Sequence, residues 1–256
     1  MKMTGNTILI TGGGSGIGRG LAEALHALGN HVVIAGRRKD VLDAVTSANP
    51  GMDSLTVDLT DSASTLAFAN EAASRYPALN VLINNAGIMK AENLREPSGD
   101  LSDAESMVVT NLLAPIRLTT ALLPLLKSQA EATVMMVTSG LAFMPLAMTP
   151  TYCATKAAIH SYAQSLRYQL KGTSVGVLEL PPPYVQTELM GPHQATDPRA
   201  MPLGEFIAEV MQILTTQPEA VEICVQRVLP LRLAESKGPA AYAQMFEGFN
   251  ASMHAD

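Results

Sequence analysis

Three residues of this chain have the types and the spacing of a proton-transfer set. Tyr152 and Lys156 are four residues apart at the start of a helix-like stretch, and Ser139 lies thirteen residues before the tyrosine. Positions four apart share one face of a helix, so the two side chains would point into the same space. A free tyrosine has a pKa of about 10, and a nearby ammonium would lower that pKa by favouring the phenolate. We therefore expect Tyr152 to give a proton to a developing alkoxide, or to take one from an alcohol.

A glycine-rich turn near the start of the chain has the features of a binding site for a dinucleotide. Residues Thr11 to Gly18 (TGGGSGIG) lie between a strand-like run and a helix-like run. A pyrophosphate needs backbone N–H groups at a helix N-terminus and no side chains in its way, and glycines meet both needs. The G-x-G-x-x-G spacing is absent, and so is a Walker A loop, because Arg19 and Gly20 replace its Lys and Ser/Thr. A glycine-rich turn without a ligand is the alternative for the turn alone.

Ser139 comes directly after a strand-like run, where α/β sheets place their ligands. Its hydroxyl could hold the oxygen of a carbonyl substrate while charge develops on that oxygen. Together with the dinucleotide turn, a proton donor beside a cation indicates hydride transfer between a nicotinamide and a carbonyl or alcohol. We expect no metal, and the two cysteines, Cys153 and Cys224, form no metal or disulfide pattern.

The composition is typical of one globular domain. The 256 residues are 47% apolar and 16% charged, which favours a buried core over disorder. We expect a single domain over residues 1–256. A net charge of −6 without a cluster of Lys and Arg gives no support to a nucleic-acid partner. Neither a signal sequence nor an apolar run of membrane-spanning length is evident, so we expect a cytoplasmic protein without a membrane partner.

Strand-like and helix-like segments alternate along the chain. Short apolar runs predict buried parallel strands at Asn6–Thr11, His31–Gly36, Asp53–Asp58, Asn80–Asn84, Ala132–Thr138 and Ser174–Leu180. Helical spacing predicts helices at Ile17–Leu28, Val41–Ser47, Ser62–Tyr76, Ser102–Leu112, Ile116–Lys127 and Ala154–Leu170. This alternation predicts an α/β fold with a single doubly wound parallel sheet, Rossmann-like, of six core strands with helices on both faces. The proline-rich stretch Pro181–Pro202 is a long connection, and such connections are often lids or binding loops. We expect residues 187–217 to form a substrate loop or lid.

The residues after the second strand bear on the choice of cofactor. An acidic residue there would accept hydrogen bonds from the ribose hydroxyls of NAD and would repel a 2′-phosphate. This chain has Arg37, Arg38 and Lys39 instead, and an arginine can hold a phosphate through charge-assisted bonds. A solvated basic helix start is the alternative, which is weakened because cations at a helix N-terminus oppose the helix dipole. We therefore expect NADP(H).

Five motifs in chain order resemble the short-chain dehydrogenase/reductase family. The turn has the family's T-G-x-x-x-G-x-G form, Asp58-Leu59 follows the third strand, and Asn84–Gly87 reads N-N-A-G after the fourth. Four residues match the family's catalytic tetrad, namely Asn111, Ser139, Tyr152 and Lys156. A Tyr-x-x-x-Lys pair alone arises often by chance, whereas the ordered set, which covers roughly residues 5 to 190, is specific.

The resemblance implies roles for individual residues. Lys156 would also bind the nicotinamide ribose, and Asp58 with Leu59 would contact the adenine ring. Asn111 would support a helix kink and a water that relays protons to Lys156, while a helix-capping or core asparagine is an equal alternative from the residues alone. The implied cofactor-binding residues are Gly12, Ser15, Gly16, Ile17, Gly18, Arg37, Arg38, Asp58, Leu59, Asn85, Ala86, Gly87, Tyr152, Lys156, Pro182, Val185 and Thr187.

Two segments depart from the family pattern. After the sixth strand the family has Pro-Gly-x-Val-x-Thr, where this chain has Pro182-Pro183-Tyr184-Val185-Gln186-Thr187, and Pro183 has a restricted φ and no N–H. The usual C-terminal strand is missing, and a helical tail with helices at Glu219–Ala234 and Ala240–Phe249 is predicted instead. The Pro-Pro variant and this tail resemble a bacterial oxidoreductase subgroup associated with D-alanine esterification of teichoic acids.

Mostly apolar side chains flank the catalytic residues in the sequence, namely Leu141, Phe143, Met144, Leu146, Tyr184, Leu189 and Met190. They predict an adaptable apolar pocket, with some of them in the ordinary core. The residues expected to bind substrate are Leu141, Phe143, Tyr184, Leu189 and Met190. No Arg or Lys lies among them, so we expect an uncharged substrate. His160 and His193 receive no role, because a lone histidine is more often solvated or in the core.

These features predict an NADPH-dependent carbonyl reductase, reversible as an alcohol dehydrogenase, for an uncharged and largely apolar ketone or aldehyde. A nucleotide-sensing binding protein on the same fold is the alternative, which the intact set of Ser139, Tyr152 and Lys156 disfavours. An epimerase or dehydratase of the longer-chain relatives conflicts with the glycine spacing. The long helices at Ile116–Lys127 and Ala154–Leu170 predict a homodimer about a two-fold axis, with a tetramer as the alternative.

Overall fold

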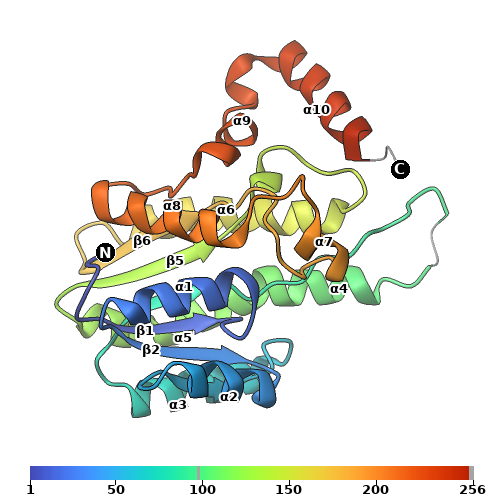
Figure 1. The fold of residues 1–256 in the computed structure, drawn as a ribbon. Helices are drawn as coiled ribbons and strands as arrows, with labels where there is room; N and C mark the ends of the chain where they lie inside the picture. The colour runs from blue at the N-terminus through green and yellow to red at the C-terminus, as the bar shows by residue number, and fades with distance from the viewer. Residues whose placement is uncertain (97–98, 254–256) are drawn as a thin grey trace.

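Six parallel strands form one sheet in the computed structural model, which describes residues 1–96 and 99–253 (Figure 1). The strands are β1 (Thr7–Thr11), β2 (His31–Gly36), β3 (Asp53–Thr56), β4 (Leu79–Asn84), β5 (Ala132–Val137) and β6 (Val175–Leu180). Their order is β3-β2-β1-β4-β5-β6, so the winding reverses between β1 and β4. The predicted doubly wound sheet of six strands is confirmed. Residues 97–98 and 254–256 of the expected domain 1–256 lie outside the described residues.

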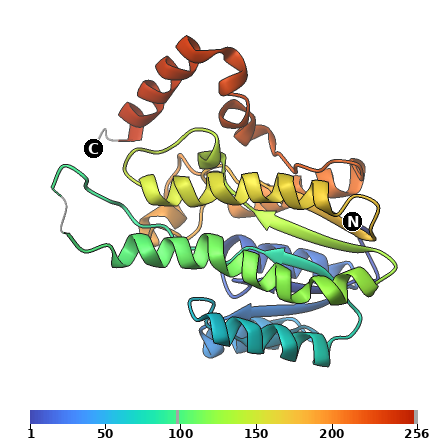
Figure 2. The same ribbon diagram turned by 180° about the vertical axis from the view of Figure 1, so that it is seen from behind.

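Helices cover both faces of the sheet (Figures 1 and 2). One face packs against α1 (Gly16–Ala27), α2 (Lys39–Ala48) and α8 (Leu203–Thr216), and the other packs against α3 (Ser62–Arg75), α5 (Ala114–Ser128) and α6 (Pro150–Gln169). Ile8 and Ile10 of β1 belong to the first core cluster, and Leu9 belongs to the second. A parallel strand that is buried on both faces must be apolar throughout, which is why apolar runs predicted the strands.

A single long helix replaces the two that the sequence predicted at Ser102–Leu112 and Ile116–Lys127. α4 (Ser102–Val108) continues into α5 through a π-helical turn at Val109–Leu113. Pro115 has no N–H to donate to the carbonyl of Asn111, four residues earlier, and the wider turn keeps the helix continuous across this gap.

The combined helix bears on the expectation about membranes. Contrary to that expectation, Ser102–Ser128 is long and apolar enough to cross a membrane, and it is the one such helix in the described part of the chain. Its residues Leu118, Leu122 and Leu126 are fully buried against the sheet. The core helix of a globular domain has the same length and composition, so the helix is weak evidence for a membrane span.

The C-terminal part differs from the prediction in one segment. The predicted helix Glu219–Ala234 is wrong over its first half, because Glu222 forms a parallel bridge with Glu179 of β6. Ile223 and Val225, two residues apart, are both buried, which is the periodicity of a strand. A single bridge therefore occupies the edge of the sheet beside β6. The short helix α9 (Leu229–Arg232) follows, and the predicted helix Ala240–Phe249 is present within α10 (Pro239–Met253).

The expected lid region 187–217 contains two different parts. Its first part is a loop with the short helix α7 (Pro192–Thr196). Its second part is mostly α8, where Phe206 and Val210 are fully buried in the same cluster as Leu21 of α1. The residues from 203 onward are therefore core, and only those before α8 can act as a lid.

Candidate active site

The glycine turn after β1 brings the backbone very close to the end of β4. Gly12 has a φ of +68°, and a Cβ on it would lie 2.9 Å from Asn85 Nδ2 and 3.0 Å from Ala86 Cα. A Cβ on Gly18 would collide with Asn85 Nδ2 and with the Gly12 carbonyl oxygen. The chain therefore requires glycine at both positions. The N–H groups of Gly12 and Gly13 donate to the carbonyl oxygen of Ala35 at 2.7 and 3.3 Å, which ties the turn to the end of β2.

Thr11 and Asn85 tie together the ends of β1 and β4, the two strands at the switch point of the sheet. Asn85 Nδ2 donates to the carbonyl oxygens of Thr11 and Gly12 at 3.0 and 3.3 Å. The Thr11 hydroxyl oxygen accepts from the backbone N–H groups of Asn85 and Ala86 at 3.0 and 3.1 Å. Asn85 and Ala86 therefore hold the turn in place. Open α/β sheets bind their ligands at this point.

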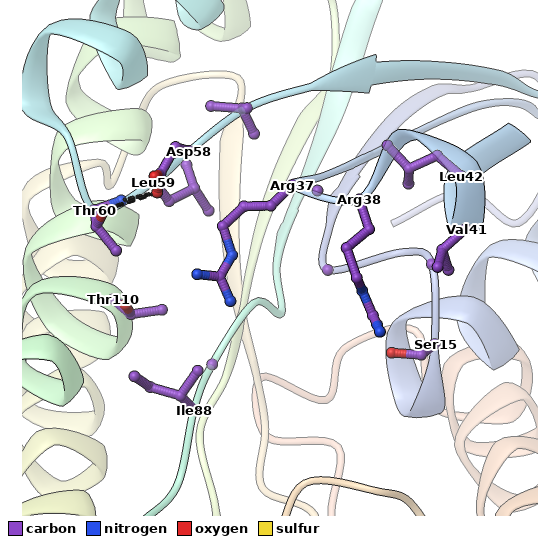
Figure 3. A pocket seen from close by; sticks show the side chains of 15 residues that line it. Ser15, Arg37, Arg38, Val41, Leu42, Asp58, Leu59, Thr60, Ile88 and Thr110 are labelled. Atoms are coloured by element: carbon purple, nitrogen blue, oxygen red, sulfur yellow. Dashed lines mark hydrogen bonds between the residues drawn. The ribbon is translucent and has the colours of Figure 1, made fainter. Parts of the chain in front are cut away.

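A cavity of about 180 Å³, here named the cofactor cavity, opens beside the turn (Figure 3). Arg37 extends into it, and Arg38 points toward Ser15. The predicted residues that line it are Gly12, Ser15, Arg37, Arg38, Asp58, Leu59 and Gly87. The sequence did not single out the other lining residues, which come from five separate segments, namely Gly14, Gly36, Val41, Leu42, Val57, Thr60, Ile88 and Thr110.

Two features of the cavity fit the predicted dinucleotide. Thr110 lines the cavity, and its hydroxyl is buried without a hydrogen-bond partner in the part of the chain that the structure describes. A Cβ on Gly87 would lie 3.3 Å from Asn111 Oδ1 and 3.7 Å from Lys156 Nζ, so glycine keeps open the space between the cavity and the lysine. A buried donor without a partner and a cradle that a side chain would fill are both features of a ligand site.

Asp58 lies at the opposite wall of the cavity from the glycine turn and forms hydrogen bonds within its own loop (Figure 3). Its Oδ1 accepts from Thr60 N at 2.9 Å and from Thr60 Oγ1 at 2.7 Å. The Thr60 backbone N–H and hydroxyl, with a smaller contribution from the charge of Arg37, lower the pKa of Asp58. The carboxylate therefore stays ionised and fixes the loop that forms this wall.

Ser139, Tyr152 and Lys156 meet at the carboxyl end of β5. Ser139 follows β5 and accepts from Leu141 N at 3.1 Å, while the tyrosine and the lysine lie one turn apart on α6. All three are buried, at 7%, 5% and 5% exposure respectively. The Ser139 hydroxyl lies beside the Tyr152 phenol and acts to lower its pKa. Lys156 Nζ donates to Val137 O at 2.9 Å and lies 5.6 Å from the centre of the Tyr152 ring.

Burial dominates the ionisation of the tyrosine and the lysine. Burial raises the pKa of the Tyr152 phenol, and the neighbouring Ser139 hydroxyl opposes this only in part. Burial lowers the pKa of the Lys156 ammonium to about 8. The expectation that Lys156 lowers the pKa of Tyr152 is not met, because withdrawal of both groups from water favours their neutral forms. The phenol therefore holds its proton at neutral pH, as a proton donor must.

Asn111 lies in the π-helical turn and fastens the loop that follows β4. Its Oδ1 accepts from Ile88 N at 2.9 Å, and its Nδ2 donates to Ile88 O at 2.8 Å and to Thr155 Oγ1 at 3.2 Å. The side chain thus joins this loop to α6 beside Lys156. The helix irregularity implied by the family resemblance is present, and in this structure the side chain amide holds the backbone.

Gln194, which the sequence reasoning missed, positions the segment after β6. Its Nε2 donates to Thr187 Oγ1 at 3.0 Å and to Val185 O at 2.8 Å. Thr187 in turn approaches the glycine turn, since a Cβ on Gly16 would lie 3.4 Å from Thr187 Cγ2. The Val185 side chain is buried, and Ile17 packs against the core, so these two support the site from outside the cofactor cavity.

A second cavity, of about 240 Å³ and here named the substrate cavity, is lined by Ser139 and Tyr152. The predicted residues Leu141, Tyr184, Leu189 and Met190 line it, together with Leu146, Pro182 and Pro183. The remaining lining residues were not predicted from the sequence, namely Met89, Gly140, Met148, His193, Gln194, Arg199, Leu231, Phe249 and Met253. Phe249 and Met253 are four residues apart on α10, and this apolar helical spacing was the one available signal.

Two expectations about the substrate cavity need correction. Phe143 is absent from its lining and instead packs with its ring centre 4.7 Å from that of His160 and 4.6 Å from the Arg232 guanidinium. The expectation that no cation lies in the pocket is wrong, because Arg199 is part of the wall. Its Nη2 lies 2.9 Å from Asp197 Oδ2, so an opposite charge accompanies it.

Comparison with known proteins decides the family. A family model described as short chain dehydrogenase matches residues 6–198. The chain belongs to the short-chain dehydrogenase family. It is 40% identical over 253 residues to the "Uncharacterized oxidoreductase DltE" of Bacillus subtilis, covering 98% of each chain. This short-chain dehydrogenase is also 29% identical to the "Uncharacterized oxidoreductase SAR2567" of Staphylococcus aureus, over 90% of this chain and 99% of the other.

Solved structures support the fold of this short-chain dehydrogenase. A Burkholderia cenocepacia short chain dehydrogenase in complex with NADP has a TM-score of 0.81 at 24% identity and covers 96% of this chain and 99% of that one. A Burkholderia phymatum relative in complex with NAD has a TM-score of 0.79 at 20% identity, with coverage of 93% and 95%. The resemblance to the family and to the DltE-like oxidoreductase is therefore confirmed. The protein is an oxidoreductase of a family that uses nicotinamide cofactors, and its structural neighbours bind both NADP and NAD.

Proposed function

We propose that this short-chain dehydrogenase reduces an uncharged, largely apolar ketone or aldehyde to an alcohol with NADPH. One observation carries the proposal: the buried Tyr152 phenol and the Ser139 hydroxyl together line a mostly apolar cavity, one helical turn from Lys156, which adjoins Gly87 of the cofactor cavity. The phenol is protonated, so it can complete a reduction by giving its proton to the oxygen of the substrate.

The side chains divide the reaction among them. NADPH, held in the cofactor cavity, would supply the hydride that the carbonyl carbon accepts. The Ser139 hydroxyl holds the carbonyl oxygen, where negative charge develops, and the Tyr152 O–H bond breaks as its proton passes to that oxygen. The Lys156 ammonium, whose Nζ lies 5.6 Å from the centre of the Tyr152 ring, would act on the phenolate only after the proton has left, since it does not lower the pKa of the resting phenol. A proton from solvent then restores the phenol.

The guanidinium groups of Arg37 and Arg38 and the hydroxyl of Ser15 support a preference for NADPH over NADH. Arg37 and Arg38 both line the cofactor cavity, and Arg38 points toward Ser15 at the glycine turn (Figure 3). β2 ends at Gly36, so no carboxylate stands where NAD would need an acceptor for its ribose hydroxyls. Guanidinium groups at that position suit the 2′-phosphate of NADP, which they can hold by charge-assisted hydrogen bonds.

The lining of the substrate cavity supports an uncharged and apolar substrate. Leucine, methionine, proline and phenylalanine side chains form most of its wall. Arg199, the one Arg or Lys among the described residues of the wall, is paired with Asp197, which also accepts from the Tyr184 hydroxyl at 3.0 Å. Burial of apolar substrate surface against such a wall supplies affinity at about 25 cal/mol per Å².

The replacement Tyr152→Phe tests the proposal. It removes the transferable proton and keeps the ring, so kcat with NADPH should fall by about 10²-fold or more while NADPH still binds. The assay follows NADPH oxidation with a panel of ketones and aldehydes, and the chirality of each product is recorded. Retention of more than about a tenth of the wild-type kcat would remove Tyr152 from its role. Tight NADPH binding without turnover of any compound in the panel would instead favour a nucleotide-sensing protein.

We also propose a homodimer through α5 and α6. The outer face of α6 carries the small exposed residues Ala154 and Ala157, together with Tyr168, whose exposure is 71%. Ile116 and Leu123 of α5 are only partly buried within the chain. Two such helix pairs about a two-fold axis form a self-complementary contact that covers these side chains.

A further inference from the structure

The last helix, α10, lies apart from the layers that enclose the sheet. In Figures 1 and 2 it extends away from the body of the fold and is joined to it through α9. Among its fifteen residues only Asn250 is buried. Gly238, with a φ of +89°, forms the turn directly before the helix. The helix contributes almost nothing to the main core, so its position needs another reason.

Asn250 fastens α10 to the loop that leads into the catalytic helix α6. Its Oδ1 accepts from Ala147 N at 2.6 Å, and its Nδ2 donates to Pro145 O at 3.2 Å. The same amide also donates to Phe246 O, one turn earlier on α10, at 3.0 Å. A buried asparagine that satisfies backbone groups of another segment specifies one arrangement of the two, because a loss of these bonds leaves buried polar groups without partners.

The residues beside Asn250 reach the substrate cavity. Phe249 and Met253 line the cavity that Ser139 and Tyr152 also line, and both pack against a core cluster that contains Tyr152 itself. Leu146 and Met148, from the loop that Asn250 holds, line the same cavity. The asparagine thus fixes two parts of one wall relative to each other, and that wall is apolar.

The neighbouring turn of the helix has a different environment. Phe246 is only partly exposed but does not line the cavity, and its ring centre lies 6.5 Å from that of Tyr242 in a stacked arrangement. Phe246 and Phe249 are therefore two phenylalanines on one helix, of which one meets the cavity and the other does not. A substitution of Phe249 can therefore affect the substrate cavity directly, whereas the same substitution of Phe246 affects only the helix.

We infer that α10 is the element that limits the size of the substrate's apolar substituent, with Phe249 as the limiting side chain and Asn250 as the residue that positions it. The inference rests on the proposed carbonyl reduction. The substrate class it names is a ketone or aldehyde with a neutral apolar substituent on the side of the carbonyl that faces α10. In an apolar pocket, a difference of one methylene group changes kcat/KM by about 10- to 200-fold, so a phenylalanine wall is a strong selector.

The test compares Phe249→Ala with the matched variant Phe246→Ala. Each variant is assayed with NADPH against butanone and methyl nonyl ketone. The quantity recorded is kcat/KM for methyl nonyl ketone divided by kcat/KM for butanone. In Phe249→Ala the ratio should shift by about tenfold or more toward the longer ketone, because the wall recedes. In Phe246→Ala it should stay within about twofold of the wild-type ratio. A ratio in Phe249→Ala that stays within this range or falls, or an equal shift in both variants, would overturn the inference.

The variant Asn250→Ala tests the positioning role by two measurements. Together they distinguish a local effect on the cavity wall from a general loss of stability. Hydrogen exchange at the Ala147 amide should become faster, because its acceptor is lost. KM for methyl nonyl ketone should change while KM for NADPH stays as in the wild type. Unchanged exchange at Ala147, or equal changes in both KM values, would contradict the role.

A failure of the proposed reaction can be told apart from a failure of this inference. Calorimetric binding of methyl nonyl ketone to the NADPH complex needs no turnover. If the wild type binds the ketone but reduces none, the reaction is wrong, and a change of Kd in Phe249→Ala but not in Phe246→Ala still supports α10 as the wall. An absence of binding to the wild type, or equal Kd changes in both variants, would overturn the inference.

Discussion

Replacement of Lys156 by methionine should stabilise the folded protein at neutral pH while it abolishes the proposed reaction. The Lys156 side chain is buried, and burial alone accounts for the lowered pKa of its ammonium. Its Nζ donates to the Val137 carbonyl oxygen. Methionine has a similar length, no charge and a flexible apolar chain that can occupy the same space.

The magnitude follows from the pKa of Lys156. A folded-state pKa of about 8, against the ordinary lysine value of 10.5, corresponds to about 3 kcal/mol of destabilisation at neutral pH. Below about pH 8 both states bind the proton, and the folded state bears this full penalty. Between about pH 8 and 10.5 only the unfolded chain still binds the proton, so the stability of the wild type rises with pH. The wild type should gain about 2 kcal/mol between about pH 7 and pH 9.5 from this group.

Loss of the hydrogen bond to Val137 offsets part of the effect in the variant, by about 1 to 2 kcal/mol. Lys156→Met should therefore be more stable than the wild type by about 1 to 2 kcal/mol at pH 7, and this advantage should fall by about 2 kcal/mol at pH 9.5. Urea unfolding followed by circular dichroism measures both, at one protein concentration because the stability of a dimer depends on concentration.

The control is Lys127→Met, which removes an exposed lysine from the end of α5. It should show no comparable change of the free energy difference between the two pH values. If the difference between Lys156→Met and the wild type is the same at both pH values, the buried ammonium is not the source of the penalty and the reasoning is refuted.

Two further predictions concern the cofactor and the assembly. Arg37→Ala should lower kcat/KM with NADPH by about ten- to 150-fold, since a hydrogen bond to a charged group is worth about 1.5–3 kcal/mol, and should leave NADH use nearly unchanged. Equal losses with both cofactors would make Arg37 structural and leave the preference to Arg38 or Ser15. Light scattering at micromolar concentration should give a mass near twice the 27.0 kDa of the chain. A mass near four times that value would show that a second interface exists.

Much of the sheet was predictable because each strand is a local pattern with a local cause. β2 has the predicted bounds, His31–Gly36, since a strand covered on both faces must be apolar and a glycine ends it. The Tyr152–Lys156 pair was predictable for the same kind of reason, because helical spacing places both side chains on one face. The start of α6 at Pro150 was missed, although a proline in the first turn of a helix is a recognisable signal.

The wrong predictions have a common cause, which is contact between segments that are far apart in the sequence. Val221 to Val225 was predicted as helix, yet pairing with β6 made Glu222 part of a parallel bridge. Phe143 follows the catalytic serine closely in the sequence but packs against His160 and Arg232. Phe249, more than a hundred residues further along, lines the substrate cavity instead. Proximity in sequence carried no information on which of the two phenylalanines would line this cavity.

The sequence by itself determined the strands, the glycine turn and the spacing of the proton-transfer set, because backbone conformation and one buried face are written in patterns of a few residues. The tertiary structure alone decided which distant segments meet, as in the wall that Asn250 joins across 103 residues to Ala147. It also decided the ionisation of Tyr152 and Lys156, which depends on how completely the surrounding segments remove water from both groups. Contacts and solvent exclusion arise only when surfaces from separate parts of the chain pack together, so no local pattern can encode them.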